Sequence, residues 1–204
     1  MAADISEQAR LYLPKYLSPS RTQELYEGLR QFPHLPDFYL PPSTIDEDLL
    51  QGDGWRGFVV GEFNSALTKT VAGIIVSSSC DIDTRNPSHT PRRILFCPLV
   101  SLRGYAHDLA AAGLEERRIS NILGNIRSQE VTDVFYLPES PYGPPESIAL
   151  LDDVHPHPLN HFKGTERTLM FRLHQTAFYV FLIKLSIHFC RMQEGVRRFA
   201  GAVA

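Results

Sequence analysis

Residues 74–83 have the sequence IIVSSSCDID, and residues 92–102 have the sequence RRILFCPLVSL. Each stretch contains a nearly continuous apolar run, and the first run ends in three serines, a cysteine and two aspartates. Such runs are typical of strands that are covered on both faces or that close into a small barrel. We therefore expect a strand at 71–78, a polar loop that displays side chains, and a second strand at 93–102.

The composition is typical of a globular protein. The chain has 204 residues, of which 43% are hydrophobic and 21% are charged, so we expect a single domain, 1–204, with a sizeable core. A formal net charge of -3 argues against broad, nonspecific binding of polyanions. Three cysteines and an N-terminus without a signal-peptide pattern indicate a reducing compartment, and we expect a cytoplasmic protein.

The periodicity of the apolar residues predicts an α+β fold. The N-terminal arm, 1–50, contains a helix at 21–32 that begins with a capping box. A small barrel at 51–173 is expected from strands near 58–63, 71–78, 93–102, 133–138, 147–152 and 168–173. A helical insert, 104–127, with helices at 105–112 and 115–127, interrupts this barrel. A long helix at 174–199 follows the last strand.

The C-terminal helix is the clearest element. Six apolar residues recur at spacings of four and three: Phe178, Leu182, Leu185, Phe189, Met192 and Val196. Further apolar residues cover most of the remaining circumference, so we expect the helix to run beneath the domain or to form a homodimer or partner interface. Its apolar stretch contains Lys184 and His188 and is too short to span a membrane. A buried cation needs a partner, and we expect one of these two residues to meet Asp81 or Asp133.

The first candidate site is Cys80, Asp81 and Asp83, which follow the first central strand, with His89 nearby. A cysteine in this position acts as a nucleophile if a histidine or a helix dipole lowers its pKa. The same residue types also bind zinc. The alternative is a small packed thiol beside aspartates that cap the turn by accepting hydrogen bonds from loop amides.

A second candidate is the segment that contains His155, His157 and His161, which follows two aspartates. Residues two apart share a face in an extended strand, so an H-x-H sequence can chelate a metal. The interleaved prolines favour polyproline geometry, in which the faces do not coincide. We therefore expect a solvated, proline-stiffened loop, and a metal site completed by Cys80 or Asp81 is the alternative.

The third candidate is a set of basic residues: Arg92, Arg93, Arg117, Arg118 and Arg127. Solvated faces and helix ends explain most such residues. Four rings could provide stacking surfaces for single-stranded RNA beside them: Tyr105, His107, Tyr136 and Tyr142. The spacing leaves both interpretations open.

The segments 70–77, TVAGIIVS, and 94–101, ILFCPLVS, are an apolar strand that ends in serine and a strand that ends in Cys-Pro-x-x-Ser. This pair resembles the core strands of the MazF/PemK-type toxins. The resemblance implies an SH3-like β-barrel and a sequence-specific endoribonuclease that cuts single-stranded RNA without a metal or another cofactor. It also implies a dimer that an antitoxin neutralises.

On this pattern, Ser101 stands where the family keeps its catalytic hydroxyl. The catalytic arginine of the family lies just before the first strand, where this sequence has Lys69. Lysine is a poor substitute for a bidentate phosphate clamp, so another arginine would have to approach Ser101. The implied site has two sets of residues: Ser101, Arg92, Cys80 and Asp81 for catalysis, and Lys69, Arg56 and Arg93 for nucleic-acid binding.

Three functions follow from these observations. The first is a MazF/PemK-like barrel protein of a bacterial toxin–antitoxin or phage-defence system that acts on RNA. The second is a non-catalytic interaction or dimerisation module that kept the barrel and lost the nuclease site. The third is a metal-dependent hydrolase that uses Cys80, Asp81 and the histidine segment.

Overall fold

A computed structural model describes residues 37–42, 48–61 and 67–190, together with Ser20, Gln23, Glu27 and Leu35. Most of the predicted helix at 21–32 and the predicted helical residues beyond Cys190 lie outside these residues. The strands are β1 (Gly54–Gly61), β2 (Thr68–Ile75), β3 (Arg93–Ser101), β4 (Val134–Leu137), β5 (Ser147–Leu150), β6 (His155–Pro158) and β7 (Thr168–Phe171). The helices are α3 (Ser79–Ile82), α4 (Leu102–Ala111), α5 (Glu116–Arg127), α6 (Leu159–Gly164) and α7 (Gln175–Cys190).

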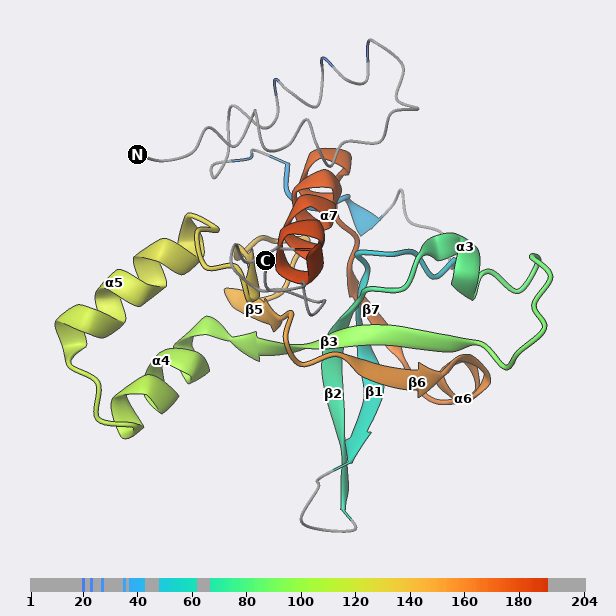
Figure 1. Ribbon diagram of the computed structural model, residues 1–204, viewed down its shortest axis with the longest axis horizontal. Coiled ribbons are helices and arrows are strands. Elements are labelled where there is room, and N and C mark those ends of the chain that lie inside the picture. Colours follow the sequence, from blue (N-terminus) through green and yellow to red (C-terminus); the bar gives the residue numbers. More distant parts are fainter. Residues whose placement is uncertain are drawn as a thin grey trace, which may run out of the picture.

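The fold is α+β, as predicted, around a seven-stranded antiparallel sheet (Figure 1). The strand order is β4-β5-β3-β2-β1-β7, and β6 also pairs with β3. Over the described residues the sheet is open, because β4 and β7 end this order and do not pair with each other. The expected small barrel is therefore not confirmed.

Strand β3 is the centre of the sheet, because three other strands pair with it. Its first half pairs with β6, its middle pairs with the end of β2, and its last three residues pair with β5. Gly73 of β2 lies opposite Pro98, and a Cβ atom at Gly73 would come within 2.5 Å of the Phe96 ring. Glycine at this position therefore lets the rings of Phe58 and Phe96 stack across β2, with centroids 3.9 Å apart.

Both faces of the central strands are buried, which explains their continuous apolar runs. Ile74 and Cys97 face a core that α7 covers, whereas the neighbouring Ile75 and Phe96 face a second core beneath α3 and α6. Consecutive residues of a strand point to opposite faces, so both faces need apolar side chains. Helices therefore cover both faces of the central strands, and the sheet does not close into a barrel over the described residues.

Helix α7 packs along one face of the sheet (Figure 1). Seven of its 16 residues are buried, including Val180, Phe181 and Ile183, and Phe189 near its end is 56% exposed. This position agrees with the prediction that the helix runs beneath the rest of the domain. Among the described residues, no helix has both the length and the apolar character needed to cross a bilayer.

Lys184 of α7 is buried and binds the segment that follows α5. Its Nζ donates hydrogen bonds to the main-chain oxygens of Gln129, at 2.8 Å, and Val131. Burial lowers the pKa of Lys184 to about 8, and the charge of Asp133 opposes this change. The expected cation is therefore present, but carbonyl groups rather than a carboxylate bind it directly.

Gln129, two residues after the end of α5, has a left-handed φ of 58°, a conformation that costs a non-glycine residue roughly 1–2 kcal/mol. Its side-chain amide donates to the Tyr136 oxygen at 2.7 Å and accepts from the Tyr136 nitrogen at 3.1 Å. The Gln129 side chain thus occupies hydrogen-bonding positions of the edge strand β4. Together with the bond from Lys184, these contacts offset the strain and attach the α4–α5 hairpin to the sheet.

A buried ion pair joins the segment before β1 to the segment after β7. Arg172, which follows β7, donates from Nε to Asp53 Oδ1 at 2.9 Å and from a terminal nitrogen to Asp53 Oδ2 at 2.8 Å. Asp53 is 1% exposed and Arg172 is 7% exposed. Asp53 Oδ2 also accepts the Leu50 N–H at 3.0 Å, so the ion pair orients the segment before β1. Burial raises the pKa of Asp53, and the Arg172 guanidinium opposes that rise.

Arg172→Met removes the partner of a buried carboxylate and should lower the free energy of unfolding by about 3–5 kcal/mol. The combination Asp53→Leu with Arg172→Met leaves neither charge buried and should recover most of this loss. Urea unfolding followed by circular dichroism measures both effects. Arg85→Met, which breaks exposed ion pairs, is the matched control and should change stability little. Equal losses for Arg172→Met and Arg85→Met would contradict the importance of burial.

Candidate functional site

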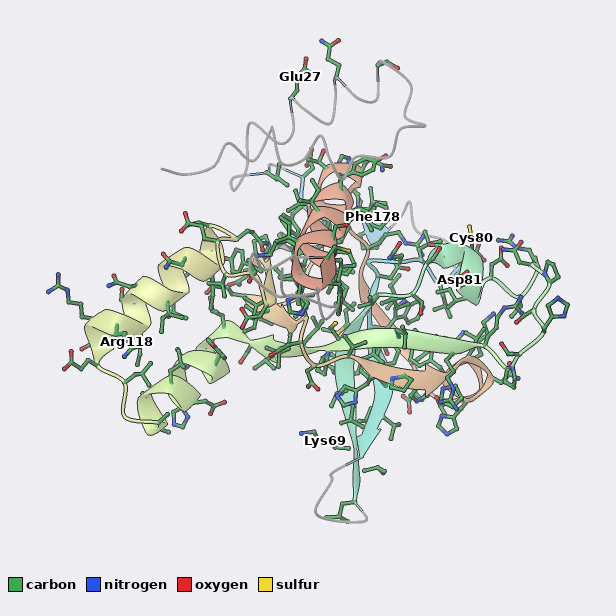
Figure 2. The ribbon with its side chains drawn as sticks, viewed as in Figure 1. Glu27, Lys69, Cys80, Asp81, Arg118 and Phe178 are labelled. Carbon is green, nitrogen blue, oxygen red and sulfur yellow. The ribbon has the colours of Figure 1, made fainter. Side chains whose placement is uncertain are left out.

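The segment IIVSSSCDID forms a rigid turn rather than a plain loop, because its hydroxyls hold the main chain. Ser77 Oγ accepts the Leu95 N–H at 2.7 Å, and Ser79 Oγ accepts the Gln51 N–H at 2.9 Å. Residues 79–82 then form α3, whose only buried side chain is Ile82. Two of the three serines, Ser77 and Ser79, therefore bind the backbone, and α3 presents Cys80 and Asp81 at the surface (Figure 2).

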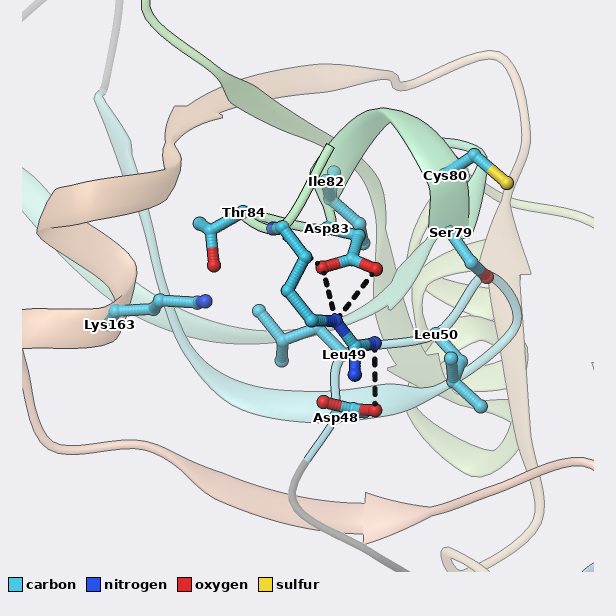
Figure 3. A pocket seen from close by; sticks show the side chains of 10 residues that line it. Asp48, Leu49, Leu50, Ser79, Cys80, Ile82, Asp83, Thr84 and Lys163 are labelled. Atoms are coloured by element: carbon cyan, nitrogen blue, oxygen red, sulfur yellow. Dashed lines mark hydrogen bonds and ion pairs between the residues drawn. The ribbon is translucent and has the colours of Figure 1, made fainter. Parts of the chain in front are cut away.

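A pocket of about 290 Å³ lies beside α3 (Figure 3). Its lining comes from the segment before β1, from α3 and the residues after it, and from α6: Asp48, Leu49, Leu50, Ser79, Cys80, Ile82, Asp83, Thr84, Arg85 and Lys163. Arg85 crosses the opening between two carboxylates. Its Nε lies 2.9 Å from Asp83 Oδ1, and a terminal nitrogen lies 3.3 Å from Asp48 Oδ2. Lys163 extends toward the same space from α6 (Figure 3).

The charges around Arg85 make this pocket polar and locally balanced. Hydrogen bonds from Arg85 lower the pKa of Asp83, and the same bonds raise the pKa of Arg85. Both groups therefore stay ionised near neutral pH. The Arg85 side chain is 73% exposed, so solvent screens these ion pairs and they contribute little to folding. Their more evident effect is to set the charge pattern that a bound molecule meets.

A second pocket of about 300 Å³ adjoins the first, because Leu50 and Ser79 line both. Four apolar residues line it: Leu40, Leu50, Leu173 and Phe178. The other lining residues are polar or charged: Gln51, Asp53, Ser79, Arg172, His174 and Gln175. We call these two neighbouring pockets the α3 groove; its first pocket has charged walls, and its second contains Leu40, Leu173 and Phe178.

The residues of the expected nuclease site do not meet. Ser101 ends β3, where its Oγ accepts the Gly104 N–H at 3.0 Å and caps α4. Arg92 precedes β3 and donates to the main-chain oxygens of Asp81, at 3.1 Å, and Asn86. Because each strand residue advances about 3.3 Å, the two ends of β3 lie roughly 26 Å apart. The structure brings Arg92 near Cys80 and Asp81, and it leaves Ser101 at the other end.

The expected nucleic-acid-binding residues are also dispersed. Arg56 and Lys69 are exposed on the β1–β2 hairpin, which extends away from α3 (Figure 2). Arg93 is exposed at the start of β3, opposite Pro158 of β6. Tyr136, one of the proposed stacking rings, donates its hydroxyl to Glu146 Oε1 at 2.7 Å. The three basic residues thus lie on the β1–β2 hairpin and at the start of β3, and Tyr136 belongs to β4.

The histidine segment is folded, so the expectation of a solvated loop is wrong. Residues 155–158 form β6, and 159–164 form α6. The prolines are tolerated because β6 is an edge strand that pairs only with β3. His157 is 3% exposed and packs against the rings of Phe58, Phe96 and Phe162.

The cysteines and histidines do not form a metal site over the part of the chain that the structure describes. No group of three or more histidine, cysteine, aspartate or glutamate side chains converges there. His155 Nε2 instead contacts Asp153 Oδ1 at 2.8 Å, and His157 packs in the second core. The buried thiol of Cys97 has its pKa raised to about 12 by burial, so it stays protonated.

Sequence reasoning missed the residues that give the α3 groove its charge: Asp48, Arg85 and Lys163. They come from three segments that are far apart in the chain. None belongs to a motif, and each has the residue type of an ordinary surface position. Only the packing of α6 beside α3 brings them together.

Comparison with known proteins adds no assignment. No protein-family model matches the chain, and no curated protein sequence matches it. The functional conclusions therefore depend on the geometry of the described residues.

His157 should make the protein acid-sensitive. Burial lowers the pKa of His157 below its usual value, and the nearby His161 adds to this effect. Below about pH 6.5 the unfolded chain then binds more protons than the folded one, so the free energy of unfolding falls as the pH decreases. Urea unfolding at pH 7.5 and pH 5.5 should show this loss in the wild type and a smaller loss in His157→Gln.

The matched control for this measurement is His107→Gln, because the His107 side chain is 83% exposed. This variant should keep the pH dependence of the wild type. If His157→Gln also kept the full pH dependence, another group would be responsible and His157 would not be the sensitive residue.

Proposed function

We propose that the protein is a non-catalytic interaction module that binds a partner through the α3 groove. The observation that carries this proposal is the separation of Ser101 from Arg92 along β3. Cleavage of a phosphodiester without a metal needs a nucleophile or acid and a charge-stabilising group within hydrogen-bond distance of the same phosphate. Groups at opposite ends of a nine-residue strand cannot both reach one phosphate.

The local role of Ser101 supports the same conclusion. Its hydroxyl oxygen accepts a hydrogen bond from Gly104, and a Cβ at Gly104 would lie 2.8 Å from that oxygen. The hydroxyl is therefore used to begin α4, as serine commonly is at an N-cap. A helix cap accounts for this serine without a catalytic function.

The construction of the α3 groove supports binding. Several of its side chains project from a turn that Ser77, Ser79 and Gln51 hold in place: Gln51 Nε2 donates to the Val76 oxygen at 2.7 Å. Binding residues are often found on such connections, because a rigid sheet positions them while their sequence stays free to vary. Helix α7 uses most of its apolar side chains inside the fold, so the groove is the better surface for a partner.

A MazF/PemK-like ancestry remains compatible with this function. In that case the two central strands are the inherited feature, and the toxin–antitoxin or phage-defence setting supplies the partner. The protein would have kept the strands of the barrel while helices α6 and α7 covered their faces. Dimerisation, RNA binding and cytoplasmic location belong to the same set of expectations.

Incubation of purified protein with mixed-sequence single-stranded RNA tests the proposal. The wild type and the variants Ser101→Asn and Arg92→Ala should all leave the RNA intact on a denaturing gel. Asn is a good N-cap residue, so Ser101→Asn removes the hydroxyl and preserves the start of α4. Cleavage by the wild type that both variants lose would overturn the proposal and restore the nuclease hypothesis.

A further inference from the structure

The α3 groove consists of two neighbouring pockets with different linings. Leu50 and Ser79 line both of them. The pockets measure about 290 and 300 Å³, and each has room for one large side chain. A chain with two side chains on one face therefore matches the groove better than a single compact molecule.

The second pocket, which contains Phe178, favours an apolar group. Leu40, Leu173 and Phe178 supply apolar surface beside its polar lining residues, and its two charged groups, Asp53 and Arg172, bind each other. A charged ligand group would have to compete with this buried pair. Burial of a leucine or phenylalanine side chain here needs no such exchange, and it removes apolar surface from water on both partners.

The first pocket, beside Arg85, offers one cation to a ligand. Arg85 is already bound by Asp83 and Asp48. Lys163 points into the same pocket (Figure 3), and among the described residues no carboxylate lies within ion-pair distance of its Nζ. An acidic side chain is therefore the complement of this end of the groove.

The surrounding charges distinguish a peptide from a nucleic acid. Asp48 and Asp83 lie on either side of Arg85 and would repel a row of phosphates. A single carboxylate on an otherwise uncharged chain reaches Lys163 without placing further negative charge beside them. The charge pattern thus favours a peptide with one acidic residue over RNA.

We propose that the α3 groove binds an extended peptide segment of a partner protein, with an apolar side chain beside Phe178 and an acidic side chain on Lys163. This inference rests on the proposed function, because it names the class of partner for the same surface. The peptide lies across Leu50 and Ser79, between the two pockets.

Selection from a random 12-residue peptide library on the immobilised full-length protein tests the inference. Enriched peptides should combine an Asp or Glu with a Leu, Ile or Phe, and a fluorescein-labelled member should bind in an anisotropy titration. Lys163→Glu should weaken this binding at least tenfold. The matched control is Lys69→Glu on the distant β1–β2 hairpin, which makes the same charge change and should alter the affinity less than twofold.

Two further measurements locate the peptide. A peptide in which the acidic residue is replaced by Lys should bind Lys163→Glu more tightly than it binds the wild type. A benzoylphenylalanine at the apolar position should crosslink to the lining of the second pocket, at Leu40, Leu173 or Phe178. Both results together would assign the two ends of the groove.

The inference is overturned if no peptide is enriched, if Lys163→Glu binds like the wild type, or if the crosslinks map elsewhere. These results differ from a failure of the proposed function. Intact RNA with no peptide binding at the groove would leave the non-catalytic function in place and remove only this partner class. RNA cleavage that requires Ser101 would remove the function itself.

Discussion

The buried ion pair between Asp53 and Arg172 is the constraint on which much of this structure depends. Two charges removed from water are tolerable only when each satisfies the other, so the segment before β1 and the segment between β7 and α7 must stay in register. The same pair lines the second pocket of the α3 groove. A change that loosened it would therefore alter the core and the α3 groove together, because one interaction holds both.

The central strands connect this constraint to the rest of the site. Alternation along β2 and β3 places Ile74 and Cys97 under α7, and it places Ile75 and Phe96 under α3 and α6. Two covered faces give the sheet the rigidity from which the serine-rich turn projects. Rigidity matters for binding because groups that are already oriented lose less conformational entropy when a partner arrives. The charged pocket of the groove thus exists because α3 and α6 cover this face of the sheet.

The site contains charged and apolar groups but no assembled catalytic set among the described residues. Ser101 serves a helix cap, and the histidine nearest the core, His157, packs among aromatic rings. Ser101 and His157 therefore have structural contacts that explain their presence. Cys80, Asp81 and Lys163 are exposed beside the α3 groove, where the proposed partner would meet them.

The local patterns of the sequence determined the α+β class, most strands of the sheet, the two helices of the insert and the buried character of α7. Apolar period and helix spacing are local properties, so they could be recognised without a structure. The open sheet, the strand within the histidine segment and the charged pocket could not be recognised from the sequence. Contacts between distant segments decide whether a barrel or helices cover the two faces of a sheet. The same contacts place β6 at an edge, where its prolines are tolerated. Lys163, Arg85 and Asp48 became a site only when tertiary packing placed α6 beside α3, because no local pattern relates residues so far apart in the chain.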